Sequence, residues 1–440
     1  MSARRLLLSA TALLVASPVA AQDVAITNAT VVIGDGSAPI QNGTVVLRGG
    51  KVLAAGAGVA VPAGARTVDA GGKWVTPGLV VAVTDIGLFD VEAVDDSNDS
   101  DSKSPFHAAL DLSPAINPLA QHISVSRAGG VTRAAVAPIG TGAIFGGQGA
   151  IIDLADDGQP ITQARAFQYV ELGERGAAAA GGSRAAVHTI LRNALVEARE
   201  LARRGGGQGA DPRLQDAAPE RPGDALLTRF DAAALVPVVM GRQPLYVRAE
   251  RASDIRMALA LKSDFPALKM VIVGASEGWT IARELAGSGV PVLATPLNDL
   301  PATFEQLAAT QSNVGRMAAA GVRVGLGAFG DQPRYAPQYA GNLVSLSKVP
   351  GASGLTWGQA FATISSVPAA ILGMDSRFGS LKPGLAGDVV IWDGDPLEVT
   401  SGVTRVFIDG VEQKLDNHST RLRDRYRVPQ EGALPKAYEW

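Results

Sequence analysis

Residues 72–87, GKWVTPGLVVAVTDIG, decide the fold of this chain. Their apolar run over residues 75–83 is typical of a buried strand. Val83 and Asp85 stand two residues apart, so an extended chain points both side chains to the same side. Val83 has no lone pair, whereas the carboxylate of Asp85 is able to bind a cation.

Outward from this stretch, between Trp74 and Pro383, apolar strand-like runs alternate with helical ones, which predicts parallel β/α units. Eight such units closing into a TIM-type (β/α)8 barrel is the economical interpretation, and active sites then lie at the C-terminal ends of the strands. The predicted strands are residues 75–83, 131–137, 244–249, 270–273, 290–294 and 322–326, with helices at 252–262 and 278–286.

The segment before the barrel reads differently. Short apolar runs follow one another through residues 23–74 with turns such as Gly34-Asp35-Gly36 and no helix between them. This pattern predicts an antiparallel sheet with one buried face. Residues 203–223 are rich in Gly, Pro, Asp and Arg, which is typical of a flexible surface insertion.

Composition narrows the function classes. The chain has 440 residues, is 47% hydrophobic and carries a net charge of -3, so we expect a globular protein without nucleic-acid or anionic-membrane partners. It has no cysteine and only four histidines, which is few for a histidine-rich metal site. The histidines are His107, His122, His188 and His418.

The first 21 residues resemble an export signal. Arg4 and Arg5 precede an apolar run over residues 6–15, and the small residues Ala20 and Ala21 form a cleavage site before Gln22. The run is too short to span a membrane. We therefore predict a periplasmic or secreted protein, exported by either the general or the twin-arginine route.

Several motifs resemble the amidohydrolase superfamily, and within it the imidazolonepropionase-like branch. They are VTPGL at residues 75–79, TISSVPAAILG at 363–373, GSLKPG at 379–384 and GDVVIWDGDP at 387–396. With the export signal at 1–21 set aside, the resemblance implies a β-sandwich domain formed by 22–74 and 383–440 and a barrel at 75–382. It also implies hydrolysis of C–N bonds in small-molecule or peptide-like substrates, with zinc or another divalent metal.

The same resemblance aligns the family's metal-binding and catalytic positions with residues that, apart from one aspartate, cannot bind a metal ion. These positions hold Val83, Asp85, Arg248, Gly274 and Phe329, and Asp331 follows two residues after the last of them. Arginine keeps its positive charge in proteins and repels a metal cation. We therefore expect no metal cofactor, and we predict that Arg248 replaces the metal and pairs with Asp85.

Three functions follow from these observations. The first is the metal-dependent C–N hydrolase that the resemblance implies. The second is a non-catalytic paralogue that binds a small ligand or forms an oligomer with itself or an active homologue. The third is metal-independent hydrolysis by carboxylates. The candidate catalytic residues are Asp85, Arg248, Glu250 and Asp331; the alternative for Glu250 and Glu277 is pairing with arginines such as Arg251.

Two further stretches bear on ligands. Residues 90–101 form an acidic loop after the first barrel strand, which suits a solvated loop better than a calcium site. Residues 140–150 are glycine-rich but lack a phosphate-binding fingerprint, so we predict a structural turn there. His107, in a loop beside Pro105 and Phe106, is the histidine best placed to reach the barrel cavity.

Overall fold

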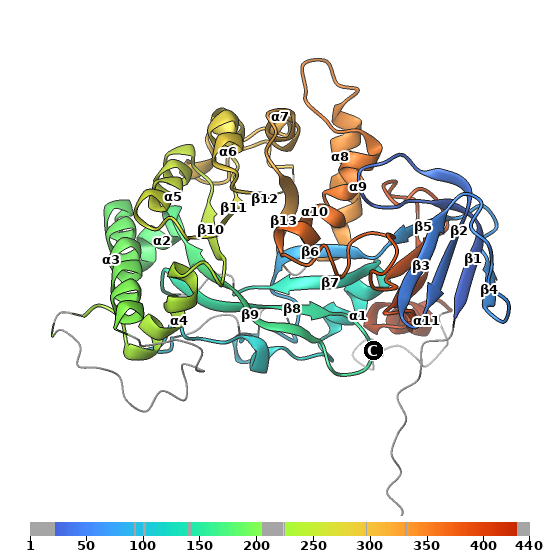
Figure 1. The fold of residues 1–440 in the computed structure, drawn as a ribbon, viewed down its shortest axis with the longest axis horizontal. Coiled ribbons are helices and arrows are strands. Elements are labelled where there is room, and N and C mark those ends of the chain that lie inside the picture. Colours follow the sequence, from blue (N-terminus) through green and yellow to red (C-terminus); the bar gives the residue numbers. More distant parts are fainter. Residues whose placement is uncertain are drawn as a thin grey trace, which may run out of the picture.

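The protein consists of a closed barrel beside a β-sheet domain (Figure 1). The structure is a computed structural model and describes residues 23–91, 94–99, 103–138, 142–204, 223, 225–295, 297–330 and 332–428. The export signal at 1–21, most of the 203–223 insertion and Asp331 lie outside these residues. None of the helices in the described ranges is long and apolar enough to cross a bilayer.

The barrel closes in the order β10-β11-β12-β13-β6-β7-β8-β9. Its strands are β6 (Leu79–Thr84), β7 (Val131–Val136), β8 (Phe145–Asp153), β9 (Ile161–Glu171), β10 (Leu245–Ala249), β11 (Met270–Gly274), β12 (Val292–Ala294) and β13 (Val324–Gly330). All neighbouring pairs are parallel except β7–β8 and β8–β9, because β8 runs against its neighbours. The TIM-like barrel is confirmed, but it contains one antiparallel strand that the β/α pattern did not predict.

Strand β8 also corrects the interpretation of the glycine-rich stretch. Residues 140–150 were predicted to form a turn, yet from Phe145 onward they are paired on both sides within the sheet. Gly149 explains the composition: a side chain there would collide with the ring of Phe167 on β9. The glycines therefore allow two backbones and an aromatic ring to approach closely.

Helices cover the outside of the barrel (Figure 1). They are α1 (Gln121–Ala128), α2 (Gly173–Ala179), α3 (Arg184–Arg203), α4 (Arg229–Val239), α5 (Ala252–Asp264), α6 (Ala282–Ser288), α7 (Asn313–Ala319), α8 (Ala336–Leu346), α9 (Trp357–Ala362) and α10 (Ser366–Ile371). Helix α3 shows why these segments are helical and pack on the barrel. Its buried residues Val187, Leu191 and Leu195 recur every four positions, so they form one apolar face. A capping box between Thr356 and Gln359 fixes the start of α9.

Both ends of the chain build the second domain. Its sheet runs β16-β15-β14-β5-β1-β2-β3, with β4 beside β1, so blue and red segments lie side by side in Figure 1. The strands are β1 (Val24–Val31), β2 (Ile40–Arg48), β3 (Lys51–Gly56), β4 (Arg66–Asp69), β5 (Trp74–Pro77), β14 (Val389–Trp392), β15 (Val403–Ile408) and β16 (Val411–Glu412). The sheet is mixed rather than antiparallel, because β4 and β5 run parallel to β1. Helix α11 (His418–Tyr426) follows the last strand.

The predicted strand 75–83 is two strands in two sheets. β5 belongs to the terminal sheet and β6 to the barrel, and the chain passes between them at Gly78. A side chain at Gly78 would collide with Thr132 of β7, and its N–H donates to the carbonyl of Asp388 (2.9 Å). A small residue is therefore required where the two domains meet.

Candidate functional site at the C-terminal end of the barrel

Two neighbouring strands carry a layer of polar side chains into the barrel. Tyr169 of β9 and Tyr246 of β10 are register partners, and both belong to the buried cluster that fills the barrel interior. Two positions further on, Glu171 and Arg248 are also register partners. Because strand side chains alternate, Glu171 and Arg248 point the same way as the two tyrosines, at the C-terminal ends of their strands. This is the end at which barrel enzymes place their active sites.

Arg248 forms a short ion pair with Glu250. Nη2 of Arg248 lies 2.7 Å from Oε1 of Glu250, and the two side chains are 22% and 2% exposed. Burial alone would lower the pKa of Arg248, but Glu250, Tyr169 and Glu171 outweigh it and raise that pKa further above its usual value. Arg248 therefore keeps its positive charge, and 22% of its side-chain surface remains exposed to solvent.

The carboxylate of Glu250 is held from its other side as well. Its Oε2 accepts hydrogen bonds from the N–H (3.0 Å) and the Oγ (2.7 Å) of Ser276, and Asn298 donates to that Oγ (3.3 Å). The prediction that Arg248 pairs with Asp85 is wrong, since among described residues its ion pair is with Glu250. Arg248 and Glu250 are two residues apart at the end of β10, so their side chains point to the same side. They can therefore pair with each other locally, whereas a pair with Asp85 would have to cross the barrel.

Gly274, at the end of β11, leaves the space that Glu250 fills. Its φ is +95°, and a Cβ there would collide with the carboxylate of Glu250. Any side chain at this position would have to displace the buried partner of Arg248. Gly274 and Glu250 therefore occupy the site together, although they come from different strands.

Glu171 is the site residue that the sequence did not reveal. Its side chain is buried, Tyr169 donates to Oε1 (3.3 Å), and Oε2 has no hydrogen-bond partner among the described residues. Burial raises the pKa of Glu171, against the opposing effects of Arg248 and Arg175. The sequence signal that could have identified Glu171 is the apolar run just before it, because that run predicts a strand that ends at Glu171.

Two other glutamates at this end accept hydrogen bonds from backbone N–H groups, and Glu305 also pairs with Arg184 (3.4 Å). Glu277 accepts from the N–H groups of Ala252 (3.0 Å) and Ala308 (3.2 Å), so it fixes the start of α5 and a distant loop. Glu305 accepts from the N–H of Glu174 (2.7 Å) in the first turn of α2. Pairing of Glu250 or Glu277 with Arg251 is not observed among the described ion pairs.

The remaining described positions belong to β6, β13 and the residue after β6. Val83 is fully buried in the barrel interior with a φ of +60°, a strained conformation for a β-branched residue. Asp85 is half-buried just after β6, and Phe329 is buried on β13. Asp331 lies outside the described residues. In the described part of the chain, no group of three or more His, Asp or Glu is arranged to hold a metal.

The four histidines make their described contacts elsewhere in the fold. The backbone N–H of His107 donates to Asp231 of α4 (2.9 Å). The ring of His122 on α1 packs against Phe89 at 4.4 Å, and Nε2 of His188 on α3 lies 3.9 Å from Asp254. His418 begins α11. In the acidic loop the described Asp90, Asp96 and Asp99 are exposed, as predicted for a solvated loop.

The barrel, the composite terminal sheet and the layer at the C-terminal strand ends together define an amidohydrolase-type architecture. The "Amidohydrolase family" profile matches residues 301–412. A 60-residue stretch is 43% identical to the amidohydrolase tasK of Hapsidospora irregularis; it makes up 14% of this chain and 6% of that protein.

Solved structures extend the likeness to most of the chain. An amidohydrolase from Thermotoga maritima MSB8 is 26% identical, with a TM-score of 0.74 over 88% of this chain and 99% of its own. Molinate hydrolase, at 18% identity and a TM-score of 0.54 over 94% and 98%, shares the fold. These likenesses support the amidohydrolase superfamily for this chain.

Proposed function

We propose that this chain is an exported amidohydrolase-superfamily protein that has lost the metal-dependent reaction and binds a small molecule at the barrel mouth through Arg248. The molecule carries an amide or carboxylate group. The ion pair between Arg248 and Glu250, in the space beside Gly274, carries the proposal.

The donor set does not fit a divalent metal. A catalytic metal needs about three nitrogen or oxygen ligands and an open position for water. At the positions given by the family resemblance, Val83, Gly274 and Phe329 offer no side-chain lone pair, and Arg248 offers a fixed positive charge instead. A cation beside that guanidinium would be repelled. No step of the proposed function therefore passes through a metal.

The same groups suit a small amide or carboxylate. The exposed part of Arg248 offers N–H donors, and Glu250 offers an acceptor that is already oriented by Ser276. A protonated Glu171, favoured by its raised pKa, adds an O–H donor. Donors and an acceptor held side by side match the C=O and N–H of an amide, which is the group that C–N hydrolases of this superfamily recognise.

Binding is tested by calorimetry on the mature full-length chain with N-acetylalanine as probe. We expect saturable binding that Arg248→Met weakens at least tenfold, which corresponds to loss of a charged hydrogen bond. The matched control is Arg251→Met, because Arg251 is an exposed arginine three positions away with no described ion pair. Equal affinity in both variants would remove Arg248 from the site.

Metal content is tested on the same protein, purified without chelators. We expect less than stoichiometric transition metal by elemental analysis. A revertant carrying Val83→His, Asp85→His, Arg248→His, Gly274→His and Phe329→Asp, with Glu250→Ala to clear the space, serves as the comparison. One transition metal bound per wild-type chain would contradict the proposal.

Export is tested by expressing the full precursor in a bacterial host and determining the mature N-terminus. Cleavage after Ala21, with the protein in the periplasmic fraction, is the expected outcome. An Arg4→Lys, Arg5→Lys precursor distinguishes the twin-arginine route, which that change blocks, from the general route. An uncleaved protein in the cytoplasm would contradict export.

One observation favours a second candidate, metal-independent hydrolysis. A general acid must hold its proton at the working pH, and burial shifts the pKa of Glu171 in that direction. If chelator-treated protein hydrolyses N-acetylalanine and Glu171→Gln abolishes this turnover while binding persists, the carboxylate mechanism replaces the non-catalytic one.

A further inference from the structure

A cavity of about 470 Å³ opens at the opposite end of the barrel. It is lined by residues that immediately precede β10, β11 and β13 and by the end of α10. Its apolar surface includes Ala166, Met270 and Leu372. The cavity thus lies at the N-terminal ends of the strands, away from Arg248 and Glu250.

Four cations line this cavity, and none of the described residues that line it is acidic. They are Arg242, Lys262, Lys269 and Arg323. Three are exposed and Lys262 is half-buried. Within the part of the chain that the structure describes, none of the four forms an ion pair; Nζ of Lys262 donates only to the carbonyl of Ser288 (3.3 Å). Their mutual repulsion is therefore not neutralised by the protein.

The backbones of two of these cationic residues are hydrogen-bonded to barrel strands, which fixes their positions. The carbonyl of Lys269 accepts from Leu245 of β10 (2.8 Å), and the carbonyl of Arg323 accepts from Val292 of β12 (2.9 Å). Their backbones are thus part of the barrel rim rather than of free loops. Lys269 precedes β11 and Arg323 precedes β13, with β12 between them, so their backbones start about 10 Å apart on the rim. Two long side chains that start at this separation can reach one ligand from opposite sides.

The C-terminal end of α10 also faces the cavity, and a helix end of this kind disfavours anions. Here its last carbonyls already accept hydrogen bonds from the backbone N–H groups of Leu372, Gly373 and Met374. The partial negative charge is therefore satisfied locally and does not balance four full positive charges.

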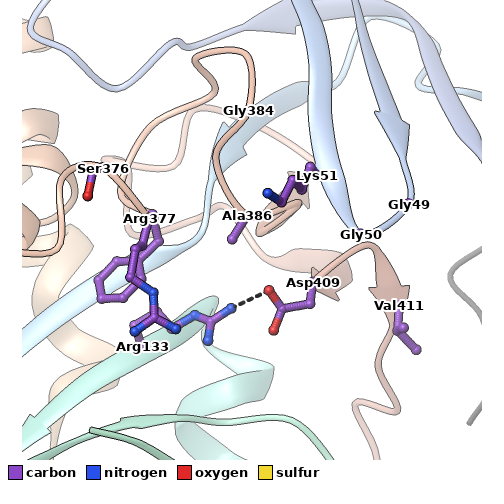
Figure 2. A pocket seen from close by; sticks show the side chains of 11 residues that line it. Gly49, Gly50, Lys51, Arg133, Ser376, Arg377, Gly384, Ala386, Asp409 and Val411 are labelled. Carbon is purple, nitrogen blue, oxygen red and sulfur yellow. Dashed lines mark ion pairs between the residues drawn. The ribbon is translucent and has the colours of Figure 1, made fainter.

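A second cavity, of about 740 Å³, provides a contrast in the same molecule (Figure 2). It too is lined by cations, namely Lys51, Arg133 and Arg377. There, however, Arg133 pairs with Asp409 (2.8 Å), which lines the cavity, and with the buried Asp388 (2.7 Å). Carboxylates of the protein already fill the role that an anion would have.

We propose that the cavity around Arg242, Lys262, Lys269 and Arg323 binds a phosphate-type anion with two or more negative charges. Such a group would replace the missing carboxylates and accept several charge-assisted hydrogen bonds at once. The phosphate belongs either to a soluble organic phosphate or to a lipid headgroup. This site is independent of the function proposed for the barrel mouth.

The test uses the mature full-length chain in a phosphate-free buffer. Pyrophosphate is titrated calorimetrically, and co-sedimentation with phosphatidic acid vesicles, whose headgroup is a phosphomonoester, is measured in parallel with phosphatidylcholine vesicles as the neutral reference. The cavity variant carries Arg242→Gln, Lys269→Gln and Arg323→Gln; all three side chains are exposed, so folding should persist. The matched control carries Lys51→Gln and Arg377→Gln in the second cavity.

We expect saturable pyrophosphate binding that falls about tenfold for each cation removed and stays unchanged in the control variant. Sedimentation with phosphatidic acid vesicles but no pyrophosphate binding, with the sedimentation lost in the cavity variant and kept in the control, supports the same site with a lipid as the source of the phosphate. Absence of both interactions in the wild-type chain, or equal losses in both variants, overturns the proposal.

Discussion

Two arginines on barrel strands, the buried Arg133 and the partly exposed Arg248, show how the same residue type can serve different roles in one fold. Arg133 sits near the start of β7 and is bound by Asp388 through two N–H groups (2.7 and 3.0 Å) and by Asp409 (2.8 Å). Its side chain is 5% exposed. Arg248 sits at the end of β10, with one short ion pair and 22% exposure.

The difference separates a structural arginine from a candidate binding residue. Asp388 precedes β14 and Asp409 follows β15, so Arg133 joins the barrel to the terminal sheet (Figure 2). Burial lowers the pKa of Arg133, but the surrounding aspartates outweigh it and raise that pKa above its usual value. The Nε and Nη2 groups of Arg133 donate to aspartates and its side chain is 5% exposed, whereas the side chain of Arg248 is 22% exposed.

The largest expected effect is at Arg133. Arg133→Met leaves Asp388 buried without its cation, so the free energy of unfolding should fall by about 3–5 kcal/mol. Urea denaturation measures this, with Arg48→Met as control because Arg48 pairs with Asp23 at the surface and should cost less than about 1 kcal/mol. Equal losses in the two variants would mean that Arg133 does not join the domains.

Gly274→Ala should come next. The added Cβ meets the carboxylate of Glu250 at a φ of +95°, which costs about 2–3 kcal/mol of unfolding free energy. The contact is isolated by a double-mutant cycle with Glu250→Ala, in which the collision is absent and the two effects should not add. Strict additivity would show that Glu250 does not occupy the space beside Gly274.

Arg248→Met should cost less than Arg133→Met, about 1–2 kcal/mol, because Glu250 keeps two hydrogen bonds from Ser276. The same urea denaturation measures it. A loss as large as that of Arg133→Met would place Arg248 among the structural arginines and would weaken its assignment as a ligand-binding residue.

The smallest expected effect is a pH dependence from Glu171. Because burial raises its folded-state pKa above the ordinary value of 4.5, its contribution to stability is present below that value and is lost as the pH rises through the folded-state pKa. Wild type should therefore lose stability relative to Glu171→Gln across that pH range, measured by urea denaturation at several pH values. A gain for wild type with rising pH would have the wrong sign.

Much of the fold was predictable because it depends on local patterns. Apolar runs located β7, β10, β11, β12 and β13, since a barrel strand buried on both sides must be apolar along its length. The motif around Asp388 identified the superfamily. Strand β8 was missed because glycines carry no side-chain signal, and their need for close backbone contact is visible only once Phe167 lies opposite.

The sequence by itself determined the resemblance to the superfamily, the composite architecture and the unusual residues at Val83, Arg248 and Gly274. Only the tertiary structure decided that Arg248 pairs with Glu250 and that Glu171 lies opposite it. Charges and apolar runs are properties of residues and can be read in order along the chain. Which charge meets which depends on strand register and on the space left by neighbours, and barrel closure sets both.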